Sequence, residues 1–344
     1  MKKMINEIKE IPYVIERQLR EYRSLIMNIV DKIKQSDFKF ITVLGRGSSD
    51  NIGLFLKYLF EINMGIPVIQ ATPSVITLYK SKLNLKESLL ITISQSGQSS
   101  DLYKFVEFAN DLGATTITIT NDQNSPIANI SNYLIPMFAG SEKAVAATKT
   151  FVASSFASLY LNYTMRADNK HIEKLYSLPD VISDVIEMKI DDSFIELTKI
   201  KNAYVIGRGY LLPFALEAAL KLKEVCNIHG EGYSASELLH GPLALIGKDF
   251  PIIYFCVDDA TKEQTKKTIE YVNKIKPLAY MLTTSRDSFQ VDEKYSHILK
   301  SVNEPEVDPL ILITFFYRIV YKIAVEKGLD PDNPPFITKV TNTL

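Results

Sequence analysis

The sequence predicts an α/β protein of two similar domains, each a doubly wound, mostly parallel sheet flanked by helices. Short β-rich runs alternate with helical patterns along most of the chain, which is typical of parallel sheets. The motif Gly45-Arg46-Gly47 follows one such run and returns as Gly207-Arg208-Gly209, with a helix expected after each. With 344 residues the chain is long enough for two cores, so an internal duplication is the economical explanation.

The first half of the chain reads as a helical region followed by five short strands. The amino terminus, to about residue 35, has the pattern of an amphipathic helix. Apolar or β-branched runs bounded by turn residues predict strands at residues 38–44, 67–71, 89–93, 115–120 and 132–138. Helices are expected at residues 51–62 and 144–164.

The second half repeats this arrangement after a polar, helical linker at residues 166–193. Strands are expected at residues 202–206, 251–257, 278–283 and 297–301. The most apolar window, residues 310–325, is too short to span a bilayer and contains Arg318 and Lys322, so we expect a buried helix there. The predicted division is a helical region at 1–35, a first domain at 36–165, the linker at 166–193, a second domain at 194–328 and a carboxy-terminal tail at 329–344.

Composition limits the partners and the compartment. The formal net charge is −1, so neither nucleic acid nor an anionic membrane is an expected partner. The two cysteines, Cys226 and Cys256, lie in apolar runs without metal-ligand spacing, which suits a reducing cytosol and predicts neither a disulfide framework nor a metal site. The charged amino terminus does not resemble a signal peptide, and we expect a cytoplasmic protein.

A serine-rich turn follows the strand expected at residues 89–93. It contains Ser94, Gln95, Ser96 and Ser99 and opens a helix, so it lies at the edge of a parallel sheet where ligands bind. Free backbone N–H groups at the start of a helix, together with hydroxyl donors, hold a phosphate by hydrogen bonds. Capping of the helix would explain one serine, but not several.

Two further serines, Ser48 and Ser49, follow an earlier strand and are expected near the same anion. The turns lack the Gly-Lys-Ser/Thr of a nucleotide phosphate loop, and no G-x-G-x-x-G motif with a downstream acidic residue is present. We therefore expect a sugar phosphate and no nucleotide cofactor.

A helix that begins near Pro213 would place Glu217, Lys221 and Glu224 on one face. Apolar residues cover most of the remaining circumference, so this charged stripe is expected to lie against protein or a cleft, where pKa values can shift. The alternative is an ordinary helix-stabilising pair of glutamate and lysine.

A short helical turn is expected farther along the chain. Ser234 and Glu237 match a capping box, and the turn ends at His240-Gly241-Pro242. A histidine in such a place is more often a cap or a packed ring than a catalyst. Here, however, two acids, a lysine and a histidine come within a short span of chain, which favours a site for acid–base chemistry.

Together these motifs resemble the double sugar-isomerase (SIS) domain family. The resemblance is carried by the loop ISQSGQSSD, the turn GRGSSDN, the segment AVAATKT at residues 144–150, the stretch LEAALKLKEVCNIHGE with ELLHGPLALI, and a lysine in the tail. It covers essentially the whole chain in matching order, and the chain resembles the isomerase half of glucosamine-6-phosphate synthase and, more closely still, stand-alone SIS-type glucosamine-6-phosphate deaminases. It implies two tandem SIS domains and a homodimer with shared active sites.

The resemblance also implies roles for individual residues. Glu224 matches the base that moves a proton between sugar carbons C1 and C2, Lys221 matches a lysine near the reacting oxygen, and Glu217 matches an acid that positions the substrate. His240 matches a ring-opening histidine that reaches the site from the neighbouring subunit, and Lys339 matches a tail lysine that closes over the sugar and can form a Schiff base. The implied phosphate ligands are Ser48, Ser49, Ser94, Gln95, Ser96 and Ser99.

Three departures from the synthase leave the sugar open. The glutamine-hydrolysing domain is absent from the sequence, so synthesis from glutamine is not expected. Near the substrate amino group, the segment from Val145 to Ala147 lacks the serine that the synthase has there. Arg46 has no counterpart in the synthase.

The expected activity is conversion of glucosamine 6-phosphate to fructose 6-phosphate and ammonia, without a cofactor. The same residues would serve a phosphosugar isomerase, a galactosamine-6-phosphate deaminase or a deglycase acting on amino-acid adducts of sugar 6-phosphates. A sugar-phosphate sensor without turnover is the alternative from another class. It would need a DNA-binding helical domain before the first strand or the loss of catalytic residues, and only about 35 residues precede that strand.

Overall fold

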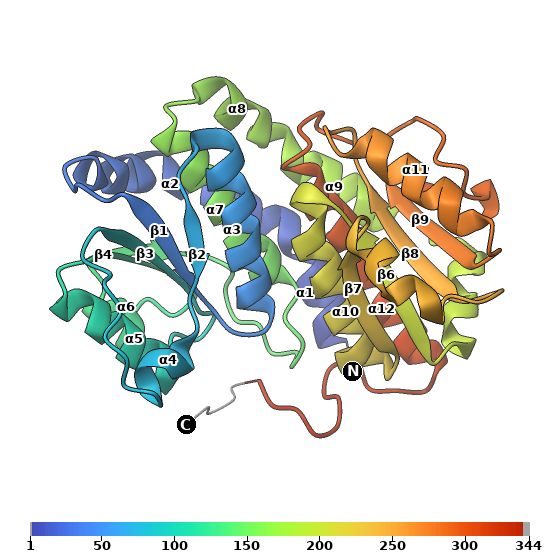
Figure 1. The fold of residues 1–344 in the computed structure, drawn as a ribbon, viewed down its shortest axis with the longest axis horizontal. Coiled ribbons are helices and arrows are strands. Elements are labelled where there is room, and N and C mark those ends of the chain that lie inside the picture. The colour runs from blue at the N-terminus through green and yellow to red at the C-terminus, as the bar shows by residue number, and fades with distance from the viewer. Residues whose placement is uncertain (1, 340–344) are drawn as a thin grey trace. The chain divides into compact units, whose positions relative to one another are not determined.

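The computed structural model describes residues 2–339, which divide into two units. Residues 10–142, 149–179 and 338–339 form the first unit, and residues 2–9, 143–148 and 180–337 form the second (Figure 1). Residues 340–344 of the expected tail lie outside the described residues. The predicted domain boundaries remain predictions.

The first unit contains a five-stranded, all-parallel sheet. In spatial order its strands are β2 (Val68–Gln70), β1 (Phe40–Leu44), β3 (Ser88–Ile93), β4 (Thr115–Thr120) and β5 (Tyr133–Pro136). This is a doubly wound order, in which the connections reverse direction between β1 and β3. The carboxyl ends of β1 and β3 therefore flank the place where such sheets bind ligands.

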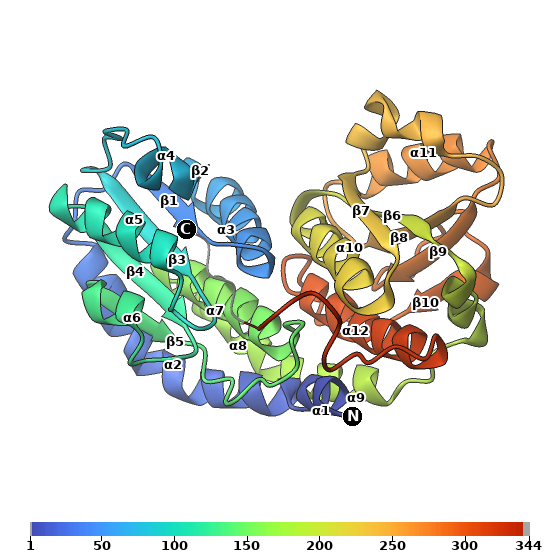
Figure 2. The ribbon, with the colours of Figure 1, turned by 90° about the horizontal axis from the view of Figure 1, so that it is seen from below.

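Helices cover both faces of this sheet (Figures 1 and 2). One face carries α2 (Ile11–Ile33), α3 (Ser48–Met64) and α7 (Lys149–Met165), and the other carries α4 (Pro73–Thr77), α5 (Ser100–Asp111) and α6 (Pro126–Ile130). Leu44 and Leu90 of the sheet pack against Phe105 of α5 in a fully buried cluster. The short helices α8 (Asn169–Lys174) and η1 (Leu175–Ser177) complete the unit.

The second unit repeats the topology. Its parallel strands are, in spatial order, β7 (His229–Ser234), β6 (Asn202–Gly207), β8 (Pro251–Cys256), β9 (Leu278–Thr283) and β10 (Ser296–Ile298). The helix α11 (Lys262–Asn273) covers one face, and α10 (Leu212–Cys226) and α12 (Asp308–Glu326) cover the other (Figure 2). The identical strand order in both units confirms the predicted duplication and the predicted α/β fold.

Shorter elements connect these parts. They are α1 (Lys3–Lys9), α9 (Leu178–Glu187), η2 (Asp192–Lys199), η3 (Gly209–Leu211), η4 (Glu237–His240), η5 (Pro242–Leu245) and η6 (Glu293–Tyr295). The start of α1 is held to the far end of the chain, because the carboxylate of Asp332 accepts from the backbone N–H groups of Lys3 and Met4 at 3.0 and 2.8 Å. The two termini of the second unit are thereby joined.

Two expectations about local structure are wrong, and one strand was missed. The helix expected at 144–164 begins only at Lys149, and residues 143–148 are irregular. Strand β7 was not predicted. The capping box is absent, because Ser234 ends β7, its hydroxyl lies 3.0 Å from that of Ser236, and η4 begins without a side-chain cap.

The apolar window expected as a buried helix is α12, which is buried over most of its length. Among residues 2–339, no helix is both long enough and apolar enough to cross a membrane.

Candidate functional site

The serine-rich turn of the first unit lies between β3 and α5, as predicted. The Ser94 hydroxyl accepts from the N–H of Gly97 at 3.1 Å, and the Ser96 hydroxyl accepts from the N–H of Gln98 at 3.3 Å. Gly97 has a φ of +61°, and a Cβ there would fall 2.0 Å from the Ser125 hydroxyl oxygen. Only glycine fits this position, and it allows the turn to close tightly.

Ser99 occupies the N-cap position of α5 but makes no side-chain capping hydrogen bond to the described residues. Its hydroxyl is therefore available to a ligand. The explanation that the serines only cap the helix does not hold for Ser99.

The turn after β1 supplies a second helix N-terminus. The helix α3 begins at Ser48, three residues earlier than expected, so Ser48 and Ser49 form its first turn. The positive ends of α3 and α5 both lie at the carboxyl edge of the sheet, beside the β1/β3 switch point. This arrangement suits an anion.

A pocket of about 340 Å³ lies between the two turns. Its lining residues are Arg46, Gly47, Ser49, Ile93, Ser94, Gln95, Ser96, Ser99, Leu102 and Lys339. Five of the six predicted phosphate ligands therefore meet there, and the sixth, Ser48, is not among the lining residues. Among the described residues, the lining includes two cations and no carboxylate, so we call it the anion pocket.

The tail lysine is held at this pocket by an ion pair with an acid that the sequence analysis did not identify. Lys339 Nζ lies 2.6 Å from Oε2 of Glu142, whose side chain is fully buried. The same carboxylate accepts from the N–H of Thr150 at 3.1 Å and from the Thr150 hydroxyl at 2.7 Å. Glu142 therefore connects the first turn of α7 with the tail, a pairing of residues 197 positions apart that no local pattern reveals.

Another hollow of the first unit, of about 460 Å³, lies among α2, α7 and α8. Its charged lining residues are of both signs, namely Arg23, Asp31, Lys34 and Glu173. It is formed by helices rather than by strand ends, and it contains none of the predicted ligands. We therefore place the anion site at the smaller pocket.

The second unit carries the predicted cluster of acids and lysine on α10. Glu217 and Lys221 are fully buried, and the Glu224 side chain is 24% exposed. Lys221 Nζ lies 3.2 Å from Oε1 of Glu217 and also donates to Oε2 of Glu224. The charged stripe thus lies against protein, and one lysine pairs with two carboxylates.

Burial by itself would lower the pKa of the Lys221 ammonium, but the charges of Glu217 and Glu224 outweigh it and raise this pKa above its ordinary value. Lys221 is therefore a permanent cation at neutral pH. From α12, the Tyr317 hydroxyl lies 3.3 Å from Oε1 of Glu217 and fixes the inner carboxylate. Glu224 is the one carboxylate of the pair that solvent or a ligand can reach.

Close packing on the sheet holds α10 in place. A Cβ at Gly232 of β7 would lie 2.8 Å from the Cα of Leu216, and one at Gly230 would lie 2.8 Å from the carbonyl oxygen of Ala219. The glycines let the helix backbone rest directly on the strand. They also explain why β7, with the sequence HGEGYS, carries no strand signal.

The remaining predicted site residues belong to the second unit. His240 is exposed at the end of η4. Val145 and Ala147 are half-buried in the irregular segment 143–148, where the Val145 N–H donates to the Asp332 carbonyl oxygen at 3.1 Å. The segment therefore forms part of the unit that carries α10.

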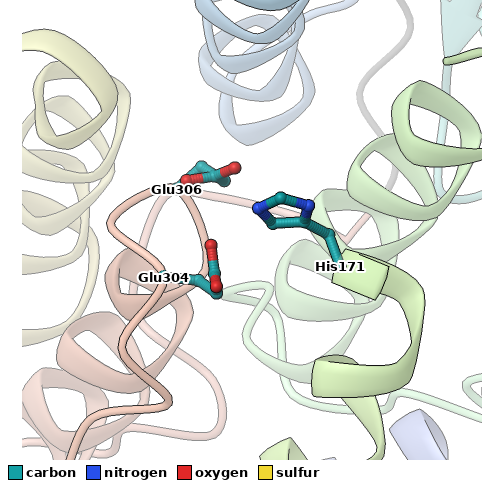
Figure 3. A group of neighbouring side chains, drawn as sticks. All are labelled: His171, Glu304 and Glu306. Carbon is teal, nitrogen blue, oxygen red and sulfur yellow. The ribbon is translucent and has the colours of Figure 1, made fainter. Parts of the chain in front are cut away.

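Figure 3 draws three titratable side chains that belong to none of these groups, namely His171, Glu304 and Glu306. His171 projects from α8 of the first unit and pairs with Asp168 at 2.7 Å, whereas Glu304 and Glu306 belong to the loop before α12 of the second unit. Because the histidine and the glutamates belong to different units, we assign them no shared role.

Comparison with known proteins places this chain among its relatives. It is 31% identical over 345 residues to an isomerizing glutamine–fructose-6-phosphate aminotransferase of Sulfurisphaera tokodaii, with 98% of this chain and 56% of that protein aligned. The chain therefore spans about half the length of the curated relatives it matches.

Solved structures resemble nearly the whole chain, among them the following two. The C-terminal domain of glucosamine-fructose-6-phosphate aminotransferase from Francisella tularensis is 25% identical, has a TM-score of 0.86, and covers 96% of this chain and 98% of its own. The glucosamine-6-phosphate deaminase of Thermotoga maritima is 21% identical with a TM-score of 0.72 and covers 99% and 100%, so it shows the shared fold alone. The SIS domain matches residues 36–162 and again 196–323. With two SIS domains over most of its length, the chain belongs to the SIS domain family.

Proposed function

We propose that the protein is a deaminating isomerase that converts an amino-sugar phosphate, most specifically glucosamine 6-phosphate, to a ketose phosphate and ammonia. The observation that carries this proposal is the anion pocket at the β1/β3 switch point, which places hydroxyls, two helix N-termini and the tail lysine together. The names of the relatives support a hexose 6-phosphate substrate, because they include fructose 6-phosphate and glucosamine 6-phosphate.

In this proposal the substrate phosphate binds in the anion pocket. The predicted donors there are Ser49, Ser94, Gln95, Ser96 and Ser99, with Ser48 in the adjoining helical turn. The neutral donors and helix N-termini bind the phosphate without requiring a change of protonation in the protein.

Glu224 is the proposed base. In the open-chain amino aldose it removes the proton from C2 and returns it to C1, which leaves an imine at C2. Water, or the amine of Lys339, then adds to this carbon and ammonia leaves. With water the product is the ketose phosphate directly, and with Lys339 a Schiff base forms first and is hydrolysed.

Lys221 is the proposed stabiliser of negative charge on the oxygen next to the reacting carbon. Its raised pKa keeps it protonated, and its two carboxylate partners hold it in one position, so it is organised before the charge develops. Glu217 is fully buried and positions Lys221 directly. Through Lys221 it also positions Glu224.

His240 and the subunit arrangement complete the proposal. We place His240 as the acid and base for opening the sugar ring, acting in the neighbouring subunit of a homodimer. Its exposure at the end of η4 supports a role toward a partner, because the side chain is not part of the core of its own unit.

One observation favours a second candidate, a phosphosugar isomerase without deamination. Val145 and Ala147 present no hydroxyl in the segment where the synthase has a serine near the substrate amino group. A substrate without an amino group would not need that contact. Such an enzyme would interconvert an aldose phosphate and a ketose phosphate and release no ammonia.

The deciding experiment measures ammonia and fructose 6-phosphate after the purified protein is mixed with glucosamine 6-phosphate. Equal amounts of both products support deamination. The absence of both, with interconversion of glucose 6-phosphate and fructose 6-phosphate, supports the second candidate. Phosphate-ester binding without turnover of any aminosugar, aldose or glycated amino-acid phosphate would contradict both and favour a sensor.

A further inference from the structure

Arg46 is a charged residue at the anion pocket that the predicted phosphate ligands do not include. It follows β1 and lines the pocket beside Ser49 and Ser96. About half of its side chain is exposed, at 48%, although it lies at the edge of a well-packed sheet. The guanidinium is thus accessible from the pocket side of the loop.

A buried acid fixes the guanidinium. Arg46 Nε and Nη2 both donate to Oδ2 of Asp101, at 3.0 and 2.7 Å, and the Asp101 side chain is only 5% exposed. The other carboxylate oxygen accepts from the N–H of Leu102 at 2.9 Å. Asp101 is therefore held by the first turn of α5 and in turn holds the arginine.

The remaining donors of Arg46 are unused within the described residues. A guanidinium has five N–H groups, and Asp101 takes two of them. A planar group with several free donors at a fixed position matches the oxygens of a phosphate, which it can bind through two parallel hydrogen bonds.

The charges around the pocket favour Arg46 over the tail lysine as the cation for the phosphate. Lys339 already pairs with the buried Glu142 at 2.6 Å, so that carboxylate offsets its charge at short range. Asp101 also offsets the charge of Arg46, but its side chain is buried and is not part of the pocket lining, and no carboxylate of residues 2–339 lines the pocket.

We propose that Arg46 binds the phosphate group of the substrate and that Asp101 is its positioning residue. The inference deepens the proposed function and rests on it, because it assigns a further ligand to the same anion pocket. It also assigns a preference to that pocket, since a dianionic phosphate monoester gains more from a full cation than an uncharged sugar or a carboxylate does.

The duplication provides a matched control. Arg208 follows β6 in the second unit as Arg46 follows β1 in the first, within the same Gly-Arg-Gly motif. The loop after β8 there carries Asp258 and Asp259 where the first unit has its serines, and the equivalent hollow is too narrow to admit a water molecule. Arg208 should therefore contribute nothing to phosphate binding.

The test is calorimetric titration with inorganic phosphate and with fructose 6-phosphate. Because hydrogen bonds between charged groups are strong, Arg46→Gln should raise both dissociation constants by roughly 10- to 100-fold. Arg46→Lys keeps the positive charge but loses the planar guanidinium that can make two parallel hydrogen bonds. This variant should raise both dissociation constants by about tenfold or less. Arg208→Gln should leave them unchanged.

Two further measurements separate binding from folding. Asp101→Asn should weaken phosphate binding less than Arg46→Gln does, because the cation remains but is no longer fixed. In steady-state kinetics, Arg46→Gln should raise KM more than it lowers kcat. A merely structural role of Arg46 would instead lower the melting temperature without a larger effect on KM than on kcat. Dissociation constants of Arg46→Gln and Arg46→Lys within twofold of the wild type would overturn the proposal.

Failure of the proposal for Arg46 can be distinguished from failure of the proposed function. If Arg46→Gln loses phosphate affinity but the wild type releases no ammonia, the role of Arg46 stands and the deaminase proposal falls. If the wild type deaminates and Arg46→Gln binds phosphate normally, the opposite holds. A wild type that binds neither ligand at millimolar concentration contradicts both.

Discussion

Replacing Lys221 by methionine isolates the energetic role of the cluster on α10. The substitution conserves most of the side-chain volume but removes the cation that pairs with Glu217 at 3.2 Å and with Glu224. Glu217 keeps the Tyr317 hydroxyl but loses its counter-charge inside a fully buried site. Glu224 suffers less, since its side chain is 24% exposed and water can solvate it.

The expected loss is set by the cost of a buried carboxylate without its cation. Breaking a buried ion pair from one side typically costs about 3–5 kcal/mol. Glu217 can limit this loss by taking up a proton, and for an acid of pKa about 4.3 protonation at pH 7 costs about 3.7 kcal/mol. We therefore expect a loss of about 3–4 kcal/mol at pH 7, or a melting temperature lower by about 6–15 °C for a domain of this size.

The loss should depend on pH. In Lys221→Met the folded state binds a proton at Glu217 that the unfolded state releases near neutral pH. The variant therefore gains stability relative to the wild type as pH falls, by about 1.4 kcal/mol per unit between pH 7 and 5. The wild type should not share this gain.

Urea denaturation of the wild type, Lys221→Met, Glu217→Gln and the double variant tests these values. The double variant should recover most of the lost free energy of unfolding, because a neutral amide replaces the buried Glu217 carboxylate that no longer has Lys221 as its counter-ion. Lys223→Met, on the same helix but exposed, is the matched control and should be nearly neutral. A loss below about 1 kcal/mol for Lys221→Met at pH 7, or a double variant no more stable than Lys221→Met, would refute this reasoning.

Three other perturbations have defined outcomes. Glu224→Gln should lower kcat by about 10³-fold or more, because it removes the proposed base, while calorimetry should find phosphate affinity unchanged. Glu142→Gln should release the tail by removing the charge that pairs with Lys339 at 2.6 Å, and mass spectrometry should then detect tryptic cleavage after Lys339 several times faster than in the wild type. Gly232→Ala should cost about 1–3 kcal/mol in thermal denaturation, because its Cβ would lie 2.8 Å from the α10 backbone.

The fold was largely predictable because its strands follow simple patterns. The predicted bounds of β4 and β9 agree with the structure, and the repeated Gly-Arg-Gly motif indicated the duplication. Strand β7 was not predicted because its glycines serve contact with α10 rather than local strand preference. That requirement is tertiary and leaves no periodicity in the sequence.

The false helix at residues 144–148 has a similar cause. Its alanines favour a helix, but the carboxylate of Glu7 in α1 accepts from the backbone N–H groups of Lys143 and Ala144. This carboxylate lies more than a hundred residues away and satisfies the irregular backbone in place of helical hydrogen bonds. Local propensity could not reveal that partner.

For the site, the serines were recognisable because polar turns after parallel strands have a known place in the sheet. Arg46 and Glu142 were not, since each is defined by a partner distant in sequence, Asp101 and Lys339 respectively. The phosphate ligands implied in the sequence analysis, Ser48, Ser49, Ser94, Gln95, Ser96 and Ser99, include no cation. The fixed guanidinium at the pocket is the reason to revise that expectation.

The division of the chain constrains how this duplicated protein can be rearranged. Residues 2–9 and 143–148 belong to the second unit, although long stretches of the first unit separate them from the rest of it. A gene fragment cut once, near residue 179, would carry α1 away from the Asp332 carboxylate that anchors it. Exchange of one complete unit for that of a relative therefore requires five junctions, so the two repeats are expected to be inherited together rather than recombined as independent modules.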